Sequence, residues 1–571
     1  MATIPLPETS AGFADATWET LAPFYRDLEL APLDATTLEA WLARWSRLDE
    51  LVTEAASLAM IAYTSDTADE GKKAAHLRFS TEVLPRLEEA EVALAKRFVA
   101  VGTDRPDLQT AVRRLRTAIE IFREANVPLV SEAEGLAAEY QQVTGTMSAE
   151  WDGERVPLPR LAPFLKRGDR AVREAAWRAA TQPYLAARDE LARLFDRLVG
   201  LRQAMARNAG FADFRDYAFA AKCRFDYTPA DCERLHDAIE EHVVPASLRA
   251  LEQRRLRLGL DRLRPWDLAI DPWRATSPVP YQDVSELQDI AAQIFTAVDP
   301  ALGGQFRTMI AEGLLDLESR PGKAPGGYCD TLHARGRPFV FMNAAGVAED
   351  VTTLLHEAGH SFHAFASHAR PFIWQRHPGA ESAELASMSM ELLAAPHMAR
   401  PTGYYTEADA MSTRLEHLED TLLSLAHIAS VDAFQNWIYT GPQGGDAAAR
   451  DQAWLALRDR FEPGIDWTGL TAERIARWYR QLHIFLYPFY YIEYGIAQVG
   501  ALQVWRNARR DPQLAVAAYR RFLALGATRP LPELYREAGV ELSFDARLIG
   551  ELVVMVEAEM ASLRSALANA A

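Results

Sequence analysis

Apolar residues recur every three or four positions along most of the chain, as they do on the buried face of an α-helix. The segments Val83–Phe98 and Leu191–Leu201 are clear examples. Ala, Leu, Arg and Glu, which all favour helices, are abundant throughout. No short repeat of the kind that builds a solenoid is visible. The pattern therefore predicts a mainly α-helical protein.

Three segments interrupt this helical pattern. Thr144–Pro159 carries Asp152-Gly153 between alternating residues, which predicts a β-hairpin. Arg262–Pro280 is rich in Pro and Trp and predicts a long irregular connection. Pro321–Gly346 contains the short strand candidate 338–343, so we expect a small sheet near residues 320–345. We expect an N-terminal helical region over 1–200 and a larger domain over 201–571.

Length and charge narrow the classes of function. A chain of 571 residues exceeds the ~250–300 residues of a single core, so we expect more than one core or lobe. The formal charge of −18 argues against nucleic acid and against a polybasic membrane-surface role. We see no signal peptide and no apolar run of the ~18–20 residues that span a bilayer. The three cysteines form no CxxC pair, which favours a reducing, cytoplasmic location.

The histidines are unevenly placed. Eight of the 13 lie between His356 and His427. Within this region Asp350–His368 has apolar residues at 351, 354, 355, 358, 362 and 365, which predicts an amphipathic helix. Asp350 can cap its start, and Arg370-Pro371 follows its end.

This helix contains the motif HEAGH at 356–360. His356 and His360 are four residues apart, so both imidazoles lie on one helix face and can bind one metal ion. Zinc accepts such ligands and keeps a position for water in catalytic sites. Glu357 points slightly off that face, where it can take a proton from the water and pass it to a leaving amine. The probability that this motif occurs by chance somewhere in the chain is a few per cent, on the order of 0.02–0.05.

Two histidines need a third protein ligand. A third His in the pattern HExxHxxGxxH is excluded, because the Gly position holds His363 and the last position holds Ala366. The alternative is a Glu on a following helix, where Glu381, Glu384 and Glu391 are candidates. Glu384 as ligand, with Glu391 accepting a hydrogen bond from a ligating His, is the economical choice. His363 is expected to lie behind the ligands or beside the substrate, with a plain core histidine as the alternative.

The chain resembles the oligoendopeptidase F and thimet oligopeptidase family of zinc metallopeptidases. The resemblance rests on HEAGH followed by His363, on the E-x-x-S-x-x-x-E block Glu384–Glu391, and on the segment His483–Tyr494. Weaker similarities lie at 326–332, 341–346, 431–439 and 534–539. Together they span roughly residues 200–565, and the first 200 residues resemble the family's helical N-terminal region.

The resemblance implies roles for individual residues. It makes Glu384 the third zinc ligand and Glu357 the general base. It assigns Tyr494, Tyr491 and His483 to the oxyanion and the substrate backbone. If the segment is one helix, Tyr487, Tyr491 and Tyr494 form one phenolic stripe. Six aromatic residues crowd this stretch, so the sequence leaves open which of Tyr487, Tyr490 and Tyr491 contacts substrate.

The family fold has two mostly helical lobes around a deep substrate channel, with a small sheet near the zinc site. The resemblance therefore implies that Phe339–Asn343 is an edge strand, with Asn343 in it, which pairs with the peptide main chain. It also implies that Gly326-Gly327-Tyr328 is a flexible loop over the substrate.

The resemblance implies a zinc endopeptidase with one Zn²⁺ per chain that cleaves oligopeptides. Two alternatives remain: a zinc exopeptidase of similar fold, and a non-catalytic helical scaffold. The sequence leaves open the cleavage preference, the natural substrates, the oligomeric state, the lobe opening, and any task for Cys223, Cys232 and Cys329.

Overall fold

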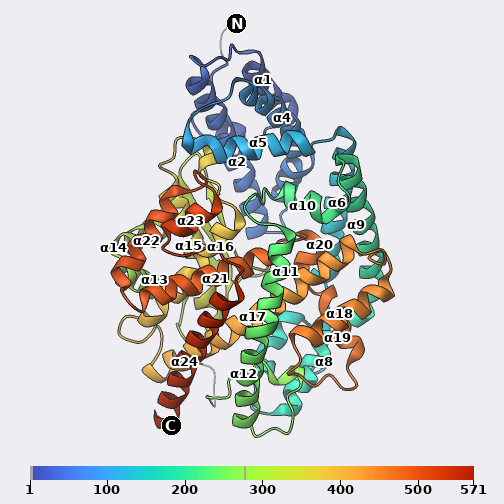
Figure 1. Cartoon of the computed structure of the whole chain (residues 1–571), viewed down its shortest axis with the longest axis vertical. Helices are drawn as coiled ribbons and strands as arrows, with labels where there is room; N and C mark the ends of the chain where they lie inside the picture. The colour runs from blue at the N-terminus through green and yellow to red at the C-terminus, as the bar shows by residue number, and fades with distance from the viewer. Residues whose placement is uncertain (1–3, 275–277, 571) are drawn as a thin grey trace. The chain divides into compact units, whose positions relative to one another are not determined.

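The computed structural model of the protein describes residues 4–274 and 278–570. Helices dominate and two small β-sheets are present, which confirms the mainly α prediction (Figure 1). Among the described residues, no helix is both long enough and apolar enough to cross a membrane. The predicted irregular connection 262–280 contains a single 3-10 turn, Pro265–Asp267, and its residues 275–277 lie outside the described residues.

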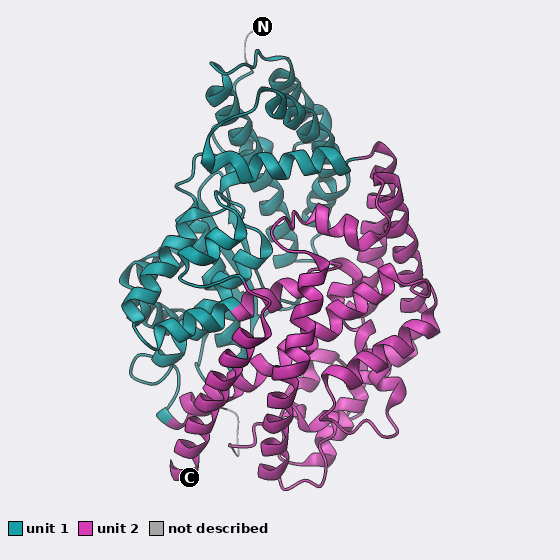
Figure 2. Cartoon of the chain, in the orientation of Figure 1, with its two compact units in different colours: residues 1–122, 279–407, 500–542 teal, residues 123–278, 408–499, 543–571 magenta. Residues whose placement is uncertain are grey.

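The chain forms two compact units, each built from three segments (Figure 2). Unit 1 comprises residues 1–122, 279–407 and 500–542, and unit 2 comprises 123–278, 408–499 and 543–571. The expected division at residue 200 falls inside unit 2, and the assignment of 1–200 and 201–571 to separate domains stays a prediction.

Unit 1 contains fourteen of the elements: α1 Trp18–Leu30, α2 Leu38–Ser65, α3 Glu70–Leu77, α4 Leu84–Val101, α5 Gln109–Ile121, α13 Val284–Val298, α14 Pro300–Ala311, β3 Leu315–Glu318, β4 Tyr328–Leu332, β5 Arg337–Ala344, α15 Ala348–Ser367, α16 Ala380–Ala394, α22 Pro512–Leu525 and α23 Leu531–Glu537. Apolar faces of α1, α2 and α4 form a core around the fully buried residues Leu28, Trp45, Leu48 and Phe98.

The sheet of unit 1 has the strand order β3-β5-β4. β3 runs parallel to β5, with Leu315 opposite Val340, and β4 runs antiparallel to it, with Tyr328 opposite Phe341. The prediction of a strand at 338–343 is confirmed. The prediction that Phe339–Asn343 is an edge strand is wrong, because β5 lies in the centre and is paired on both sides. Such a strand has its main-chain hydrogen bonds used within the sheet, and β4 is an edge strand instead.

Helix α15 begins directly after β5, and one carboxylate fixes its start. Asp350 accepts hydrogen bonds from the backbone N–H groups of Ala345, Gly346 and Val347 at 2.8, 2.8 and 2.9 Å. The hydroxyl of Tyr281 also donates to it. Asp350 therefore acts from the first turn of the helix, where a negative charge is favourable.

Unit 2 contains most of the remaining elements: α6 Val127–Gly145, β1 Ser148–Trp151, β2 Glu154–Pro157, α7 Ala162–Leu165, α8 Arg170–Ala186, α9 Arg188–Ala209, α10 Phe214–Ala221, α11 Pro229–Ala238, α12 Val244–Arg257, α17 Glu407–Thr440, α18 Ala447–Phe461, α19 Thr471–Tyr479, α20 Leu482–Leu486 and α24 Ala546–Ala570. Helix α21, Tyr491–Ala508, begins in unit 2 and ends in unit 1. The hairpin β1–β2 confirms the prediction from Asp152-Gly153, whose φ angles are both positive.

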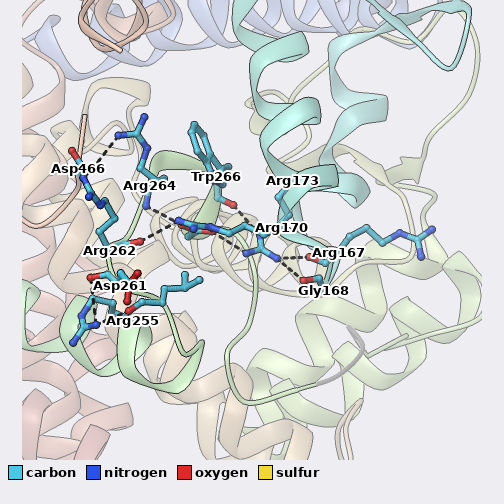
Figure 3. Close-up of polar contacts among 12 residues, drawn as sticks. Arg167, Gly168, Arg170, Arg173, Arg255, Asp261, Arg262, Arg264, Trp266 and Asp466 are labelled. Carbon is cyan, nitrogen blue, oxygen red and sulfur yellow. Dashed lines mark hydrogen bonds and ion pairs between the residues drawn. The ribbon is translucent and has the colours of Figure 1, made fainter. Parts of the chain in front are cut away.

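Arg170 and Arg173 of α8 reach toward the turn at 265–267, where Arg173 meets Trp266 (Figure 3). Asp267 is fully buried and accepts hydrogen bonds from Arg170 at 3.1 and 2.7 Å and from Arg173 at 2.9 Å. The backbone N–H of Arg264 donates to it at 2.9 Å. Arg173 also donates to the carbonyl oxygens of Trp266, Arg167 and Gly168. The charge of Asp267 is thus neutralised inside unit 2.

Candidate metal centre

Two neighbouring helices of unit 1 bring the predicted ligands together. α15 carries His356 and His360, whose ring centroids are 5.0 Å apart. α16 carries Glu384, whose Oε2 lies 3.3 Å from Nε2 of His356 and 3.7 Å from Nε2 of His360. One ligand atom from each of the three residues lies within 4.8 Å of the others. Of the three candidate glutamates, Glu384 is thus the one whose carboxylate lies near Nε2 of both histidines.

A glycine allows this close approach. Gly359 stands between the ligands on α15, where α16 passes directly over it. A Cβ at this position would lie 2.5 Å from Cα of Ser387, 2.7 Å from the carbonyl oxygen of Ala386 and 2.9 Å from N of Ser387. All three are backbone atoms, which cannot rotate away. The fourth residue of HEAGH is therefore glycine for a packing reason that spacing alone does not show.

Two groups orient the ligands. The ring Nδ1 of His356 lies 2.7 Å from Oε1 of Glu391, which follows Glu384 by about two turns on α16. Because Nδ1 donates to this carboxylate, Nε2, which faces Glu384, carries the free lone pair that a metal ion could use. Ser387 donates its hydroxyl to Oε2 of Glu384 at 3.0 Å. The roles of Glu384 as a ligand and of Glu391 as an orienting group stay predictions.

Glu357 is buried beside this centre, with 8% of its surface exposed. Burial raises the pKa of its carboxyl to about 7, while His356 lowers the pKa and Glu384 and Glu391 raise it. A carboxyl with a pKa near neutrality can both accept and release a proton, as a general base and acid must. A bound cation would lower this pKa.

His363 lies one turn further along α15 and is buried. Its ring packs against Phe522 at 5.4 Å, and neither ring nitrogen has a hydrogen-bond partner among the described residues. Burial lowers the pKa of His363 to about 3, so the ring is neutral. This environment matches the core-histidine alternative, and a role beside the ligands or the substrate stays a prediction.

The predicted substrate residues of unit 1 lie on or beside β4 and β5. Tyr328 stacks on Phe341 at 4.8 Å, and its hydroxyl lies 2.6 Å from that of Thr64. Asn343 donates its side-chain amide to the carbonyl oxygens of Ala324 and Gly326 at 2.8 and 3.0 Å. Two carbonyl groups of the loop before β4 thus accept hydrogen bonds from Asn343, and the expected flexibility of this loop stays a prediction. Contacts of Gly327, Tyr328 and Asn343 with substrate stay predictions.

Lys323, in the same loop, connects the loop to β3 and β5. Its Nζ donates to the carboxylate of Asp316 at 2.9 Å and to the carbonyl oxygens of Asp316, Glu318 and Met342 at 2.8, 2.9 and 2.6 Å. Its side chain is fully buried. Spacing in the sequence gave no sign of this role.

The His/Tyr segment lies in unit 2 and is not one helix. Helix α20 ends at Leu486, and α21 begins at Tyr491. Pro488 disfavours helical backbone at Tyr487, which is 53% exposed, and Phe489 has a φ of 61°. The prediction that Tyr487, Tyr491 and Tyr494 form one helical stripe is therefore wrong. Tyr491 and Tyr494 do share the first turn of α21.

The ring of His483 nevertheless lies among the tyrosines. Its centroid is 4.9 Å from that of Tyr491, 5.9 Å from Tyr494, 6.0 Å from Tyr490 and 6.1 Å from Tyr487. Arg224, which follows the end of α10, supports the bend by donating to the carbonyl oxygen of Phe489 and to Glu493. Sequence reasoning missed Arg224, and it missed the polar partners of His483 described below, because no motif marks them.

Comparisons with known proteins agree with this geometry. The sequence pattern of Peptidase family M3 matches residues 164–553, which is more than half of the chain. The oligoendopeptidase F homolog of Lactococcus lactis is 23% identical over 397 residues, which cover 66% of this chain and 61% of that protein. Oligopeptidase PepF of Bacillus subtilis is 22% identical over 451 residues, which cover 74% of this chain and 65% of PepF. The chain thus aligns with less than two thirds of each of these two proteins.

Solved structures extend the likeness to nearly the whole chain. The structure of Pz peptidase A with an inhibitor has a TM-score of 0.88 and 27% identity, and 98% of each chain is covered. The oligoendopeptidase-F of Enterococcus faecium shares the fold, with a TM-score of 0.63 at 16% identity. Together with the HEAGH helix and Glu384, these matches confirm the resemblance drawn from the sequence: the chain belongs to peptidase family M3.

Proposed function

We propose that this protein is a zinc-dependent oligoendopeptidase, which hydrolyses internal bonds of short peptides. The observation that carries the proposal is the convergence of His356, His360 and Glu384 within 4.8 Å, with Glu357 buried beside them. The names of the relatives, oligoendopeptidase F and oligopeptidase PepF, support the same substrate class.

The donor set fits zinc. Two imidazole nitrogens and one carboxylate oxygen are the ligands of many catalytic zinc sites, which keep a fourth position open. The orienting contact from Glu391 to His356 is the usual support of such a ligand. One zinc ion bound here would act as a Lewis acid and lower the pKa of a water molecule.

Glu357 handles the proton in this mechanism. Its position directly after His356 places its carboxylate beside the ligand face, and its burial keeps the proton affinity high. We assign it to accept a proton from the attacking water and to donate that proton to the nitrogen of the departing amine.

The His/Tyr segment supplies hydrogen-bond donors. Tyr494 and His483 are assigned to the developing oxyanion, because donors aimed at such a charge contribute strongly to peptide hydrolysis. Tyr491 and Tyr487, together with Gly327, Tyr328 and Asn343, are assigned to the substrate main chain.

A peptide blocked at both ends tests the activity. The protein should cleave it at an internal bond, lose activity on treatment with a chelator and regain activity with zinc. Glu357→Gln should keep zinc and lose most turnover. Exclusive release of terminal residues from an unblocked peptide would establish the exopeptidase instead. Absence of any chelator-sensitive cleavage would favour the scaffold.

Metal content tests the ligand assignment separately. Glu384→Ala should lower the amount of zinc per chain that survives dialysis. Glu381→Ala is a matched control, since Glu381 lies one turn earlier on α16 and outside the ligand trio. Wild-type zinc content in Glu384→Ala would transfer the ligand role to another carboxylate.

A further inference from the structure

A chain of hydrogen bonds in unit 2, which we call the relay, leads to His483. Its other members, Arg458, His427 and Gln481, lie outside every motif. Nη1 of Arg458 on α18 lies 2.7 Å from Nδ1 of His427 on α17. Nε2 of His427 lies 3.1 Å from Oε1 of Gln481, which precedes α20. Nε2 of Gln481 lies 3.1 Å from Nδ1 of His483. Each step joins two side chains, so the direction of every hydrogen bond matters.

Arg458 sets the direction at the first step. A guanidinium has five N–H donors and no acceptor, so Nδ1 of His427 must accept. The side chain of Arg458 is fully buried and forms an ion pair with Glu462, the residue that follows the end of α18. Because the guanidinium is buried, water does not replace it as the donor to Nδ1 of His427.

His427 is neutral in this environment. Burial lowers its pKa well below the usual range, and Arg458 and Arg477 lower the pKa further. An acid also lies close to the ring, since Oε1 of Glu462 is 3.4 Å from Nδ1. Glu462 is already paired with Arg458 and with Arg477, the latter at 3.0 Å. With Nδ1 accepting from Arg458, the single ring proton lies on Nε2.

The remaining steps follow from this proton. Nε2–H of His427 donates to Oε1 of Gln481, which fixes the orientation of the amide. The amide NH₂ of Gln481 then faces His483, so Nδ1 of His483 accepts. The ring of Tyr491 meets that of His483 edge-on at 4.9 Å, so the ring that Gln481 orients also packs against a tyrosine of the His/Tyr segment.

We propose that Arg458, His427 and Gln481 are positioning residues that hold His483 as the neutral tautomer with its proton on Nε2. In this form Nε2 of His483 is a hydrogen-bond donor, which suits a peptide carbonyl or an oxyanion and does not suit proton abstraction. The proposal rests on the proposed function, since it deepens the role of His483 within the same site.

The test reverses the direction of the hydrogen bond between residue 481 and His483. Gln481→Glu preserves size but replaces the NH₂ donor with an oxygen that only accepts. At a pH where the ring of His483 carries a single proton, the carboxylate draws that proton onto Nδ1. Gln203→Glu is the matched control, because Gln203 also uses its amide within unit 2, donating to the carbonyl oxygen of Tyr439 at 2.8 Å, and is not one of the residues of this hydrogen-bonded chain.

The first readout is the tautomer itself and requires no peptidase activity. In full-length protein labelled with ¹⁵N-histidine, the ring nitrogens of His483 are assigned by their loss in His483→Gln. The wild type and Gln203→Glu should show a protonated Nε2 and an unprotonated Nδ1. Gln481→Glu should show a protonated Nδ1. A protonated Nδ1 of His483 in the wild type would overturn the proposal.

The second readout is kinetic. Gln481→Glu should lower kcat by on the order of 100-fold, as loss of one preorganised donor does, with a much smaller change in KM. Zinc content should stay at the wild-type level. Wild-type kcat in a folded Gln481→Glu protein would refute the relay. If that variant does not fold, Gln481→Met provides the same comparison by removing donor and acceptor together.

The two readouts separate failure of the relay from failure of the proposed function. If the wild type cleaves no peptide, the proposed function fails, while the tautomer of His483 still decides the relay. If the wild type cleaves peptides and its His483 carries the proton on Nδ1, the relay alone fails.

Discussion

The substitution Gly359→Ala tests why the metal centre forms at all. The added Cβ would lie 2.5 Å from Cα of Ser387, whereas non-bonded carbon atoms are stable at about 3.5–4.0 Å. The obstacle is the backbone of α16, so no side-chain rotation can relieve it. The helices α15 and α16 must separate locally by roughly 1 Å.

This separation acts directly on the metal ligands. His356 and His360 flank Gly359 on α15, and Glu384 stands one turn before Ser387 on α16. A metal site tolerates changes in ligand distance of about 0.2 Å, so a shift of this size removes Glu384 from the coordination sphere. We expect zinc affinity to fall at least as far as when a group that orients a ligand is lost, which is about 10–100-fold. Overpacking should also lower the free energy of unfolding of the metal-free protein by about 1–3 kcal/mol.

Competition with a chromophoric chelator measures the zinc dissociation constant, and thermal unfolding of the metal-free protein measures stability. Gly304→Ala is the matched control, because Gly304 also lies in a helix of unit 1 and a Cβ there meets nothing within 4 Å. It should keep wild-type zinc affinity and gain about 0.5–1 kcal/mol of stability. If Gly359→Ala binds zinc as tightly as the wild type, the helix contact does not position Glu384 and the reasoning is wrong.

Three further predictions concern other parts of the molecule. Glu391→Ala removes the acceptor of Nδ1 of His356 and should weaken zinc binding by about 10–100-fold in the same competition assay; an unchanged constant would deny Glu391 its orienting role. Asp267→Asn leaves the buried Arg173 without its counter-charge and should lower the free energy of unfolding in urea at pH 7 by about 3–5 kcal/mol. Burial raises the pKa of Asp267, but hydrogen bonds from Arg170, the Arg264 N–H and Arg173 outweigh burial and hold this pKa below its usual value. The stabilisation by Asp267 is therefore complete above the unfolded pKa of about 3.9 and is lost as the pH falls through the lower folded pKa. The free energies of unfolding of the wild type and of Asp267→Asn should thus become more similar in acid. A difference between them that does not change with pH would contradict this. Tyr494→Phe should lower kcat of peptide cleavage more than it raises KM, and an effect confined to KM would assign the phenol to binding.

Local sequence signals predicted the local structure well. The apolar spacing at 351–365 marked α15, and Asp152-Gly153 marked the hairpin, because these patterns reflect interactions within a few residues. The spacing of His356 and His360 likewise predicted that their rings lie close together on one helix, as the structure shows. The contact of Glu384 with this pair is a tertiary one, and the resemblance to a known family supplied it.

The signals that failed depend on partners distant in the chain. Nothing in residues 338–343 indicates that strands pair on both sides of β5, so its central position was not predicted. The aromatic spacing of 487–494 suggested one helix. Pro488, which disfavours helical backbone, already indicated the break between α20 and α21 that the structure shows. Gln481 lies two residues before His483, but its role depends on His427, which is 54 residues away.

The separation of the two groups of functional residues has a consequence for experiments. All three candidate ligands, together with Glu357 and Glu391, lie in unit 1, and each ligand contact is made within that unit. His483, Tyr491 and Tyr494, with the relay through Gln481, lie in unit 2. Zinc affinity should therefore report on unit 1 alone, and substitutions in the His/Tyr segment should leave it unchanged while they lower turnover. A drop in both quantities after a change in unit 2 would mean that metal binding depends on more than the two helices that carry its ligands.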